Sequence, residues 1–574
     1  MNFINKKAIR KALSLMASVA LGAGALTLAG CDDFLDEPVQ GNSIDKDYYD
    51  TTYKLQTALN ATYDILQSDA MTDTDWRFGE ALADDCIGND EGLTSQMGQL
   101  VNWTFNTSNI YIKNRWEIYY KAVHRVNQVI ANVDRVRVIG NTTNDFQNVR
   151  YILGQAKFLR AYFYFNLVRT FGGVPIRPEV ETVENLVIPR SSLEDCYAYI
   201  EKDLREALIM LPARFTHENA GKVGAGACAA LLMKVLMYQA KPGDGSDKWT
   251  QCAEIGDYFI GKQAKTFGDI LRFDERYPDT SWEDLRESLW FKPVSALADG
   301  EAPETLQTLA PEMGNSYRLE YLDAYNNPIT YYEQFYEAGE FCAGSVWEVV
   351  FKESGDGSTG DTNEGCSIYW KLFGADWNPA LKTTTRIRSN TFSGGDIRST
   401  YIVGHNETTP DKQSVANGPG NLSPLKWWTP IMDRPTNSDD SGKNRRMLRY
   451  VESVLTYAEA LNECGRMQEA LEQLNTCKRQ VGSIDNRNIE VAAGGYGWLR
   501  DQIWLERRME LAYEWDRFFD LARSGRAAKF IHSYAADVLN HRGELFREGI
   551  NEIFPIPQTE IDISNGVVTQ NPGY

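Results

Sequence analysis

The spacing of apolar residues predicts a chain built mostly from α-helices. From Thr51 onward, apolar side chains such as Leu55 and Leu59 recur every three or four residues, which is the period of one helix face. A later long stretch of this kind stops at a Gly-Gly-Val-Pro sequence, a strong helix-ending signal. Serines followed by acidic residues at 191–195 are typical of a helix start. The predicted helices cover residues 51–66, 111–136, 148–171, 191–211 and 223–240.

Two segments lack this helical period. Residues 69–109 are acidic and irregular. Residues 278–435 carry many Gly, Pro, Asn and Asp residues, so loops, short strands and short helices are expected there. Within that segment, the stretch 345–352 (SVWEVVFK) is the best candidate for a strand.

Helical spacing returns at Arg446 and continues into a helix–turn–helix pattern. Large and small residues over 457–477 fall on the positions that tetratricopeptide repeats reserve for packing residues. Gly465 breaks the pattern between two amphipathic stretches, and Ala470 permits close approach of the two helices. A further helix, dense in charges and aromatic rings, is predicted over 498–523.

The first 31 residues have the order of a lipoprotein signal peptide. Basic residues precede an uncharged run over 12–30, which ends in Leu28-Ala29-Gly30 directly before Cys31. In such signals the thiol is lipidated and becomes the new N-terminus, so Cys31 is the predicted lipidation site. The alternative is a transmembrane helix, since the run is long enough to span a bilayer. Its small residues and the acidic stretch after it favour the signal peptide, which would leave the lipid as the only membrane anchor.

Acidic residues outnumber basic ones, 79 to 59, and give a net charge of −20. Because attraction to phosphate dominates nucleic-acid binding, this charge argues against nucleic acid as a partner. The nine cysteines include no C-x-x-C pair and the five histidines no H-x-x-x-H pair, so a zinc site is not expected and no metal ligand is assigned. Most cysteines after Cys31 lie among apolar residues, where a free thiol packs as a small core residue.

Two features could suggest enzyme or cofactor chemistry. Residues 224–229 read as G-x-G-x-x-A, but the dinucleotide fingerprint needs an apolar strand before it, and residues 216–222 do not form one. Close helix packing through small residues is therefore the favoured interpretation. The Arg-Glu and Asp-Arg pairs over 506–523 are more typical of a structural ion-pair network than of an acid/base site. We therefore predict no catalytic residues and no cofactor.

Aromatic residues are the positive signal for ligand binding. A sugar ring offers an apolar C–H face to a flat aromatic ring and a polar rim to Asn, Asp and Arg. The alternative is that most of these rings are core, because aromatic side chains are usually buried in part. The candidate ligand-binding residues are Trp103, Trp282, Tyr317, Tyr321, Trp370 and Trp377. All but Trp103 lie in the irregular segment 278–435, which also contains Trp290, Tyr325, Tyr331, Tyr332 and Trp347.

Five sequence motifs together resemble the SusD/RagB family of outer-membrane lipoproteins. They occur in the family's order and cover nearly the whole chain after the leader. One such motif alone would be weak, but five in order are specific. They are Cys31-Asp32-Asp33-Phe34-Leu35-Asp36, the run AKFLRAYFY (156–164) through FGGVP (171–175), YAEALNE (457–463), ERRMEL (506–511) with RFFDL (517–521), and FPIP (554–557) with QNPGY (570–574).

The resemblance implies a mostly α fold in which tetratricopeptide-like helix pairs form a scaffold. An irregular, loop-rich middle segment with short strands would form the ligand face. The implied division is a signal peptide (1–30), an acidic tether (31–50), an N-terminal helical region (51–277), a variable segment (278–435) and a C-terminal helical region (436–574). The family captures glycans or other nutrients at the cell surface for a SusC-like TonB-dependent transporter, without catalysis. It has no fixed binding motif, so no binding residue is carried over.

Several alternatives stay open from the sequence. The chain could be a surface glycoside hydrolase, or a tetratricopeptide scaffold that binds only proteins. The ligand could also be a peptide rather than an oligosaccharide. Asp32, directly after the lipidated cysteine, would retain a lipoprotein at the inner membrane in some bacteria, whereas the family's hosts read acidic residues there as a surface-export signal.

Overall fold

The computed structural model divides the chain into two units, residues 1–50 and 51–574, and the fold described here is that of the second. Cys31, Trp370 and Trp377 lie outside the described residues. No helix of the described residues is both long and apolar enough to cross a bilayer. The described residues are 48–88, 95–138, 142–180, 182, 186–352, 381–383, 396–398, 403–404, 423–427, 441–482, 495–535 and 543–574.

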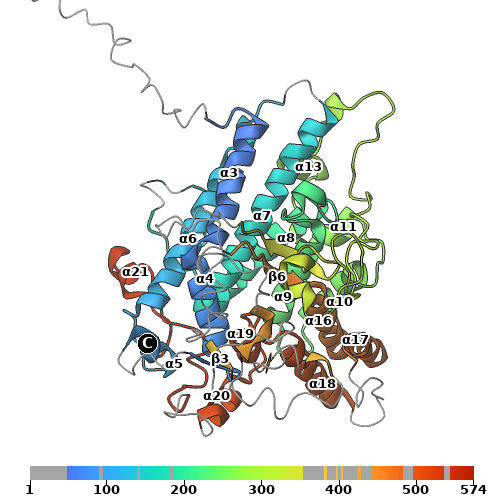
Figure 1. Cartoon of the computed structure of the whole chain (residues 1–574). Helices are drawn as coiled ribbons and strands as arrows, with labels where there is room; N and C mark the ends of the chain where they lie inside the picture. The colour runs from blue at the N-terminus through green and yellow to red at the C-terminus, as the bar shows by residue number, and fades with distance from the viewer. Residues whose placement is uncertain are drawn as a thin grey trace, which may run out of the picture. The chain divides into compact units, whose positions relative to one another are not determined.

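The N-terminal half is a series of helices in which each packs against the next, from α6 through to α10 (Figure 1). Capping side chains fix where helices begin: the Thr51 hydroxyl accepts from the Lys54 amide, and the Ser192 hydroxyl from the Asp195 amide. The helices are α3 (Thr52–Asp64), α4 (Asp69–Trp76), α5 (Gln96–Val101), α6 (Ile110–Ala131), α7 (Thr143–Phe171), α8 (Leu193–Met210), α9 (Ala225–Gln239) and α10 (Asp247–Phe259).

Helix α7 is the centre of this half. Phe158, Ala161 and Phe163, which point in different directions around it, are all fully buried. A helix that is apolar around most of its circumference is stable only inside a core. The neighbouring helices α3, α6 and α8 supply that cover.

The middle of the chain contains short elements, as its composition predicted. The helices are α11 (Phe267–Leu271), α12 (Phe273–Arg276) and α13 (Trp282–Ser288). The predicted strand is confirmed, although it is shorter than expected. The described strands form three antiparallel pairs: β1 (Cys86–Gly88) with β3 (Leu381–Thr383), β2 (Ser345–Val349) with β6 (Arg445–Arg449), and β4 (Val403–Gly404) with β5 (Ser423–Pro424).

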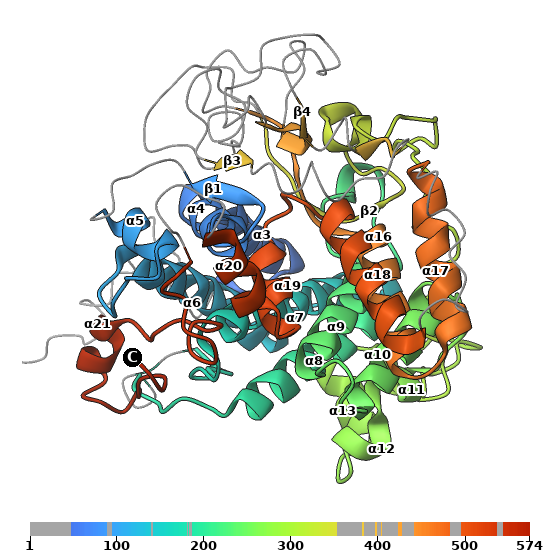
Figure 2. The same cartoon turned by 90° about the horizontal axis from the view of Figure 1, so that it is seen from below.

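The C-terminal half confirms the predicted helix–turn–helix. Gly465 adopts a φ of +78° between the two helices, and Ala470 is fully buried where they meet. Helices α16, α17 and α18 lie side by side (Figure 2). The helices are α16 (Tyr450–Glu463), α17 (Met467–Gln480), α18 (Gly495–Glu510), α19 (Arg517–Arg523), α20 (Ala527–Ala535) and α21 (Gln558–Ile563).

The two halves meet where α10 packs on α16. A Cβ atom on Gly256 would lie 2.1 Å from Cδ2 of Tyr457, so only glycine lets this ring contact the helix backbone. The Tyr457 hydroxyl donates to Asp257, and the Arg466 guanidinium pairs with the same carboxylate at 3.0 Å. The tetratricopeptide-like helix pair is therefore joined to the N-terminal helices by both packing and charge.

Several sequence-based boundaries were wrong. Helix α6 ends at Ala131 rather than at 136, and α7 begins at Thr143 rather than at 148, with the Thr142 hydroxyl as its cap. Residues 69–109 are not irregular throughout, because the hydroxyls of Ser68 and Ser95 cap α4 and α5. The segment from Arg446 to Arg449 is a strand, because it supplies the hydrogen-bonding partner for β2; the helix begins only at Tyr450.

The helix expected over 498–523 is interrupted between Glu510 and Arg517. Tyr513 and Trp515 adopt positive φ angles of +63° and +66° there. A Cβ on Gly79 would lie 1.8 Å from the Trp515 carbonyl oxygen, so this turn packs directly against the η3 segment (Arg77–Ala81). Tertiary packing decides this break, and no residue in the local sequence signals it.

Candidate functional site

Three of the predicted ligand-binding rings lie in the interior. Trp103 is 7% exposed and packs against Phe518 and Phe546, with ring centroids 5.5 and 4.7 Å away. Trp282 is 9% exposed, and its indole N–H donates to the Glu304 carbonyl oxygen at 2.9 Å. Tyr317 is 3% exposed. These three side chains are part of the hydrophobic core of the structure.

The burial of Tyr317 also explains the G-x-G-x-x-A sequence. Gly224 precedes the first residue of α9, and the Tyr317 ring lies over Gly226, where a Cβ would come within 2.2 Å of ring atom Cε2. The Tyr317 hydroxyl donates to the Ala213 carbonyl oxygen at 3.0 Å. Gly226 thus allows close packing against a tyrosine and Gly224 close packing against the backbone of residues 212–214, which agrees with the packing interpretation of this sequence.

The remaining described candidate, Tyr321, begins a hairpin that carries an exposed ring. We call residues 321–329 the tyrosine hairpin; they form the sequence YLDAYNNPI. Tyr321 is partly exposed, whereas Tyr325 at the tip is 82% exposed. The Ile329 amide donates to the Tyr321 carbonyl oxygen at 2.9 Å and closes the base of the hairpin. The exposed ring of Tyr325 is therefore held on an ordered turn rather than on a free loop.

Polar side chains fix the tip of the hairpin. The Asp323 carboxylate accepts from the backbone amides of Tyr325 and Asn327, both at 2.8 Å. The Asn327 side-chain amide also donates to it, and these hydrogen bonds lower the pKa of Asp323. Asn326 takes a φ of +67°, a conformation that asparagine tolerates, and its side-chain oxygen accepts from Arg318. An exposed ring thus lies beside amide and carboxylate groups, the combination that suits a sugar.

Tyr325 is one of the aromatic residues of the segment 278–435, but it is not among the candidate ligand-binding residues predicted from the sequence. A usable signal was present, because Asp-Ala-Tyr-Asn-Asn-Pro at 323–328 is rich in turn-forming residues. Aromatic residues at the tip of a tight turn cannot be covered by the turn itself. The other middle rings differ: Tyr331 and Trp347 are buried, and Trp290 and Tyr332 are partly exposed.

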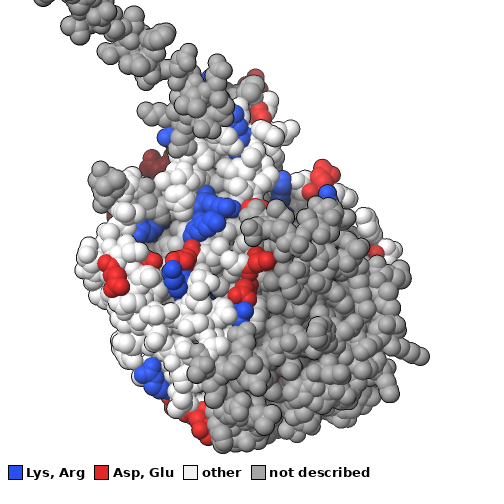
Figure 3. All heavy atoms as spheres, turned by 60° about the vertical axis from the view of Figure 1, so that its left-hand side comes forward, with Lys and Arg blue, Asp and Glu red and all other residues white. Residues whose placement is uncertain are grey.

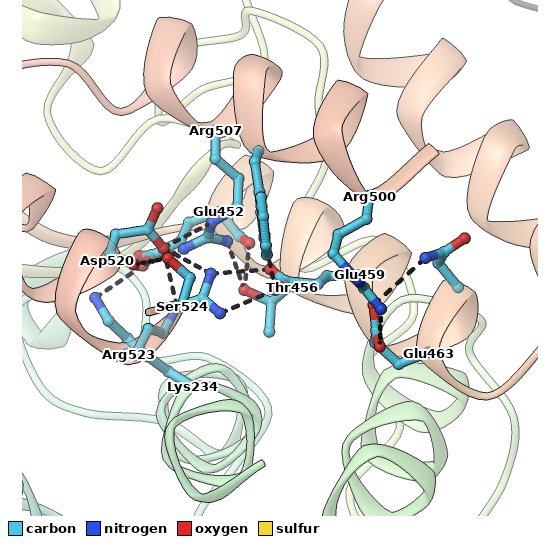
Figure 4. A network of polar contacts seen from close by, with 12 residues as sticks. Lys234, Glu452, Thr456, Glu459, Glu463, Arg500, Arg507, Asp520, Arg523 and Ser524 are labelled. Atoms are coloured by element: carbon cyan, nitrogen blue, oxygen red, sulfur yellow. Dashed lines mark hydrogen bonds and ion pairs between the residues drawn. The ribbon is translucent and has the colours of Figure 1, made fainter. Parts of the chain in front are cut away.

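The charged residues of α18 and α19 form an extended ion-pair network with α16 (Figure 4). Arg523 contacts both carboxylate oxygens of Glu459 at 2.9 Å and Asp520 at 2.6 Å. Arg507 donates to the Thr456 hydroxyl at 2.9 Å. Most of these partners come from different helices, so the network joins the helices to one another.

The electrostatics of this network do not suit acid/base chemistry. Burial alone would raise the pKa of Asp520, but the nearby Arg523 and Arg507 outweigh it and hold that pKa below its usual value. Burial would likewise raise the pKa of Glu459, but the nearby Arg523 outweighs burial and lowers that pKa. A general acid or base works best with a pKa near the working pH. The structure therefore favours the interpretation of this cluster as scaffold.

Neither a charged patch on the face shown in Figure 3 nor a metal site is evident among the described residues. Basic and acidic side chains lie close to one another on this face, and most of its described surface is uncharged (Figure 3). No group of three or more His, Cys, Asp or Glu side chains among the described residues could hold a metal ion. All seven described cysteines are free and six of them are buried, as expected for small core residues.

Comparison with known proteins matches both halves of the chain to one family. Residues 33–237 match a family model described as "Starch-binding associating with outer membrane", and residues 390–574 match the model of the SusD family. The chain is 24% identical over 558 residues to SusD-like protein P2 of Formosa agariphila, covering 96% of this chain and 98% of that protein. It is 25% identical over 269 residues to a SusD-like protein of Bacteroides ovatus, covering 46% of each.

Solved structures show the same fold. A laminarin-binding SusD-like protein superposes with a TM-score of 0.67 at 21% identity, covering 92% of this chain and all of the other. Surface glycan-binding protein A of Bacteroides thetaiotaomicron, solved with laminarihexaose, gives a TM-score of 0.65 at 20% identity, covering 91% of this chain and 99% of the other. The five sequence motifs, the helical architecture and the two family matches agree, and the chain belongs to the SusD/RagB family.

Proposed function

We propose that this chain is a surface lipoprotein that binds an oligosaccharide or polysaccharide and delivers it to a SusC-like TonB-dependent outer-membrane transporter. Membership of the SusD/RagB family supports this function, as do the ligands of two structural neighbours, laminarin and laminarihexaose. The lipid on Cys31 is the proposed anchor. In this proposal the chain captures the glycan and performs no catalytic step.

The observation that carries the proposal is the tyrosine hairpin. Tyr325 offers a ring that is largely open to solvent, on the same turn as the Asn326 side-chain amide and the Asp323 carboxylate. A pyranose can stack its C–H face on such a ring while its hydroxyl groups bond to the polar neighbours. One ring of this kind gives modest affinity, which is sufficient where a transporter supplies a second contact.

The test is retention in native affinity gels that contain soluble polysaccharides, laminarin among them. The full chain should be retarded by at least one polysaccharide, and Tyr325→Ala should remove most of that retardation. Tyr53→Ala is the matched control, because Tyr53 is 80% exposed on α3, away from the hairpin in sequence, and should change nothing. Equal retardation of the wild type and Tyr325→Ala would overturn the proposed site. Mass measurement of the N-terminal peptide tests acylation at Cys31.

The alternatives predict different outcomes in the same material. A glycoside hydrolase would release reducing ends from the retained polysaccharide and lose this activity on replacement of one carboxylate. A protein-binding scaffold would show no retardation by any polysaccharide. A peptide-binding protein would bind peptides whose uptake depends on the same hairpin.

A further inference from the structure

A second site, which shares no residue with the tyrosine hairpin, is lined by the first turns of α7 and the end of α13, two helices labelled in Figure 1. It is a cavity of about 260 Å³. Its lining comes from the start of α7, from the end of α13 and from the segment 292–304. The residues that matter for its chemistry are Phe146, Arg150, Arg286, Trp290 and Lys292, with Glu301 and Glu304 at its edge.

Two of the three basic side chains in this cavity are already paired. Arg150 forms an ion pair with Glu304 at 2.8 Å. Lys292 pairs with Glu301 at 3.0 Å and also donates to the Thr143 hydroxyl at 3.1 Å. Each acidic residue in the lining is therefore matched by one of these two bases.

The third base, Arg286, is buried without a partner. It is 3% exposed, and its guanidinium makes no hydrogen bond or ion pair with any described residue; its Nε atom is fully enclosed. Arginine stays protonated in proteins, so the free-energy cost of burying its charge cannot be avoided by loss of a proton. A buried charge is ordinarily paired or bound to a ligand. The cavity thus carries one uncompensated positive charge.

Aromatic rings define the shape of the same cavity. Trp290 and Phe146 lie with ring centroids 6.1 Å apart, and both are partly exposed. Trp290 takes a φ of +57°, just after the end of α13, and its indole N–H donates to Asp134 at 3.1 Å, which fixes its orientation. Sites for drug-sized ligands measure roughly 300–1,000 Å³, so a cavity of 260 Å³ suits a single ring.

We propose that this cavity binds a ring-shaped ligand that carries one singly charged oxyanion, a carboxylate or a sulfate ester, with Arg286 as the group that neutralises it. The planar guanidinium can donate two parallel hydrogen bonds to such a group. Trp290 and Phe146 contact the face of the ring. An acidic sugar has this chemistry, and the inference does not require the tyrosine hairpin to bind anything.

Isothermal titration of the full chain, held in detergent, with four probes tests the proposal. The probes are D-glucuronate, glucose 6-sulfate, D-glucose and inorganic sulfate. Glucuronate or glucose 6-sulfate should bind at least tenfold more tightly than glucose and inorganic sulfate. The tighter of the two identifies the preferred oxyanion. Equal binding of all four probes, or binding of none, would overturn the proposal.

Variants locate the binding. Arg286→Met should lower the affinity for the acidic probe at least tenfold. Trp290→Ala should also lower this affinity, and it provides a second test if Arg286→Met fails to fold. Arg479→Met is the matched control, because that arginine is exposed and already paired with Glu472. Tyr325→Ala should leave this affinity unchanged, so that failure of the glycan site and failure of this cavity remain distinguishable. Unchanged affinity in both Arg286→Met and Trp290→Ala would overturn the site.

Discussion

Two buried arginine clusters in this protein differ in how their charge is balanced. In the network of α16, α18 and α19, Arg523 is 2% exposed at its side chain and contacts Glu459 and Asp520. In the cavity beside α13, Arg286 is just as buried but has no acidic partner among the described residues. Paired arginines hold helices together, whereas an unpaired one costs free energy unless something from outside the chain neutralises it. The comparison separates scaffold from site without reference to sequence motifs.

Breaking the balanced cluster should have the largest effect. Arg523→Met would remove the ion pair of the buried Glu459 carboxylate and the cation with the largest effect on Asp520, which we expect to lower the free energy of unfolding by about 3–5 kcal/mol. The shift of the denaturation midpoint in urea measures it. Arg479→Met, which removes an exposed pair with Glu472, should cost less than about 1 kcal/mol. Similar losses in both variants would contradict the assignment of Arg523 to the scaffold.

The cluster around Glu340 has the opposite imbalance, a surplus of acid. Glu340 and Glu348 lie near a single Arg446, and burial, followed by the charge of Glu348, raises the pKa of Glu340 to about 8. In the unfolded chain this carboxyl has its ordinary pKa near 4.5, so the folded state binds the extra proton between these values. The contribution of protonated Glu340 to the free energy of unfolding is complete below pH 4.5 and is lost as the pH rises towards 8.

The variant Glu340→Gln should remove this pH dependence. At about 1.4 kcal/mol per pKa unit, we expect it to be more stable than the wild type by about 2–4 kcal/mol above pH 8 and similar to it near pH 4. Unfolding midpoints measured across this pH range provide the check. A difference between the two proteins that stays constant with pH would show that Glu340 is not protonated in the folded state.

The smallest effect is expected at the unbalanced arginine, and it has the opposite sign. Without ligand, Arg286→Met removes a buried unpaired charge and should raise the free energy of unfolding by about 1–2 kcal/mol. Thermal unfolding without added anions measures it. A clear loss of stability would instead mean that Arg286 supports the fold, and the contrast with Arg523 would then fail.

The elements of the scaffold could be predicted because their signals are local. The end of α7 and the start of α8 follow from glycine at the helix end and from the Ser192 cap, both of which lie directly beside the boundary. The break after Glu510 could not be predicted, because it depends on contact with Gly79, more than 400 positions earlier in the chain.

The sites were harder to predict for a similar reason. Sequence composition identified an aromatic-rich segment, but Trp282 and Tyr317 are covered by Phe267 and by Gly226, whereas Tyr325 lies at the tip of a turn and is covered by nothing described. Arg286 carries no sequence signal at all. Its lack of a partner becomes visible only when Arg150 and Lys292 are seen to use the nearby carboxylates.

The helical class, the tetratricopeptide-like pair around Gly465 and the family could all be predicted without a structure. These properties depend on residue spacing along the chain and on motifs that stay together in sequence. Tertiary structure alone decided which rings are exposed and which charges are paired. Exposure and pairing depend on what distant segments place over each side chain, and the free energy of a buried charge is set by those neighbours rather than by its own position in the chain.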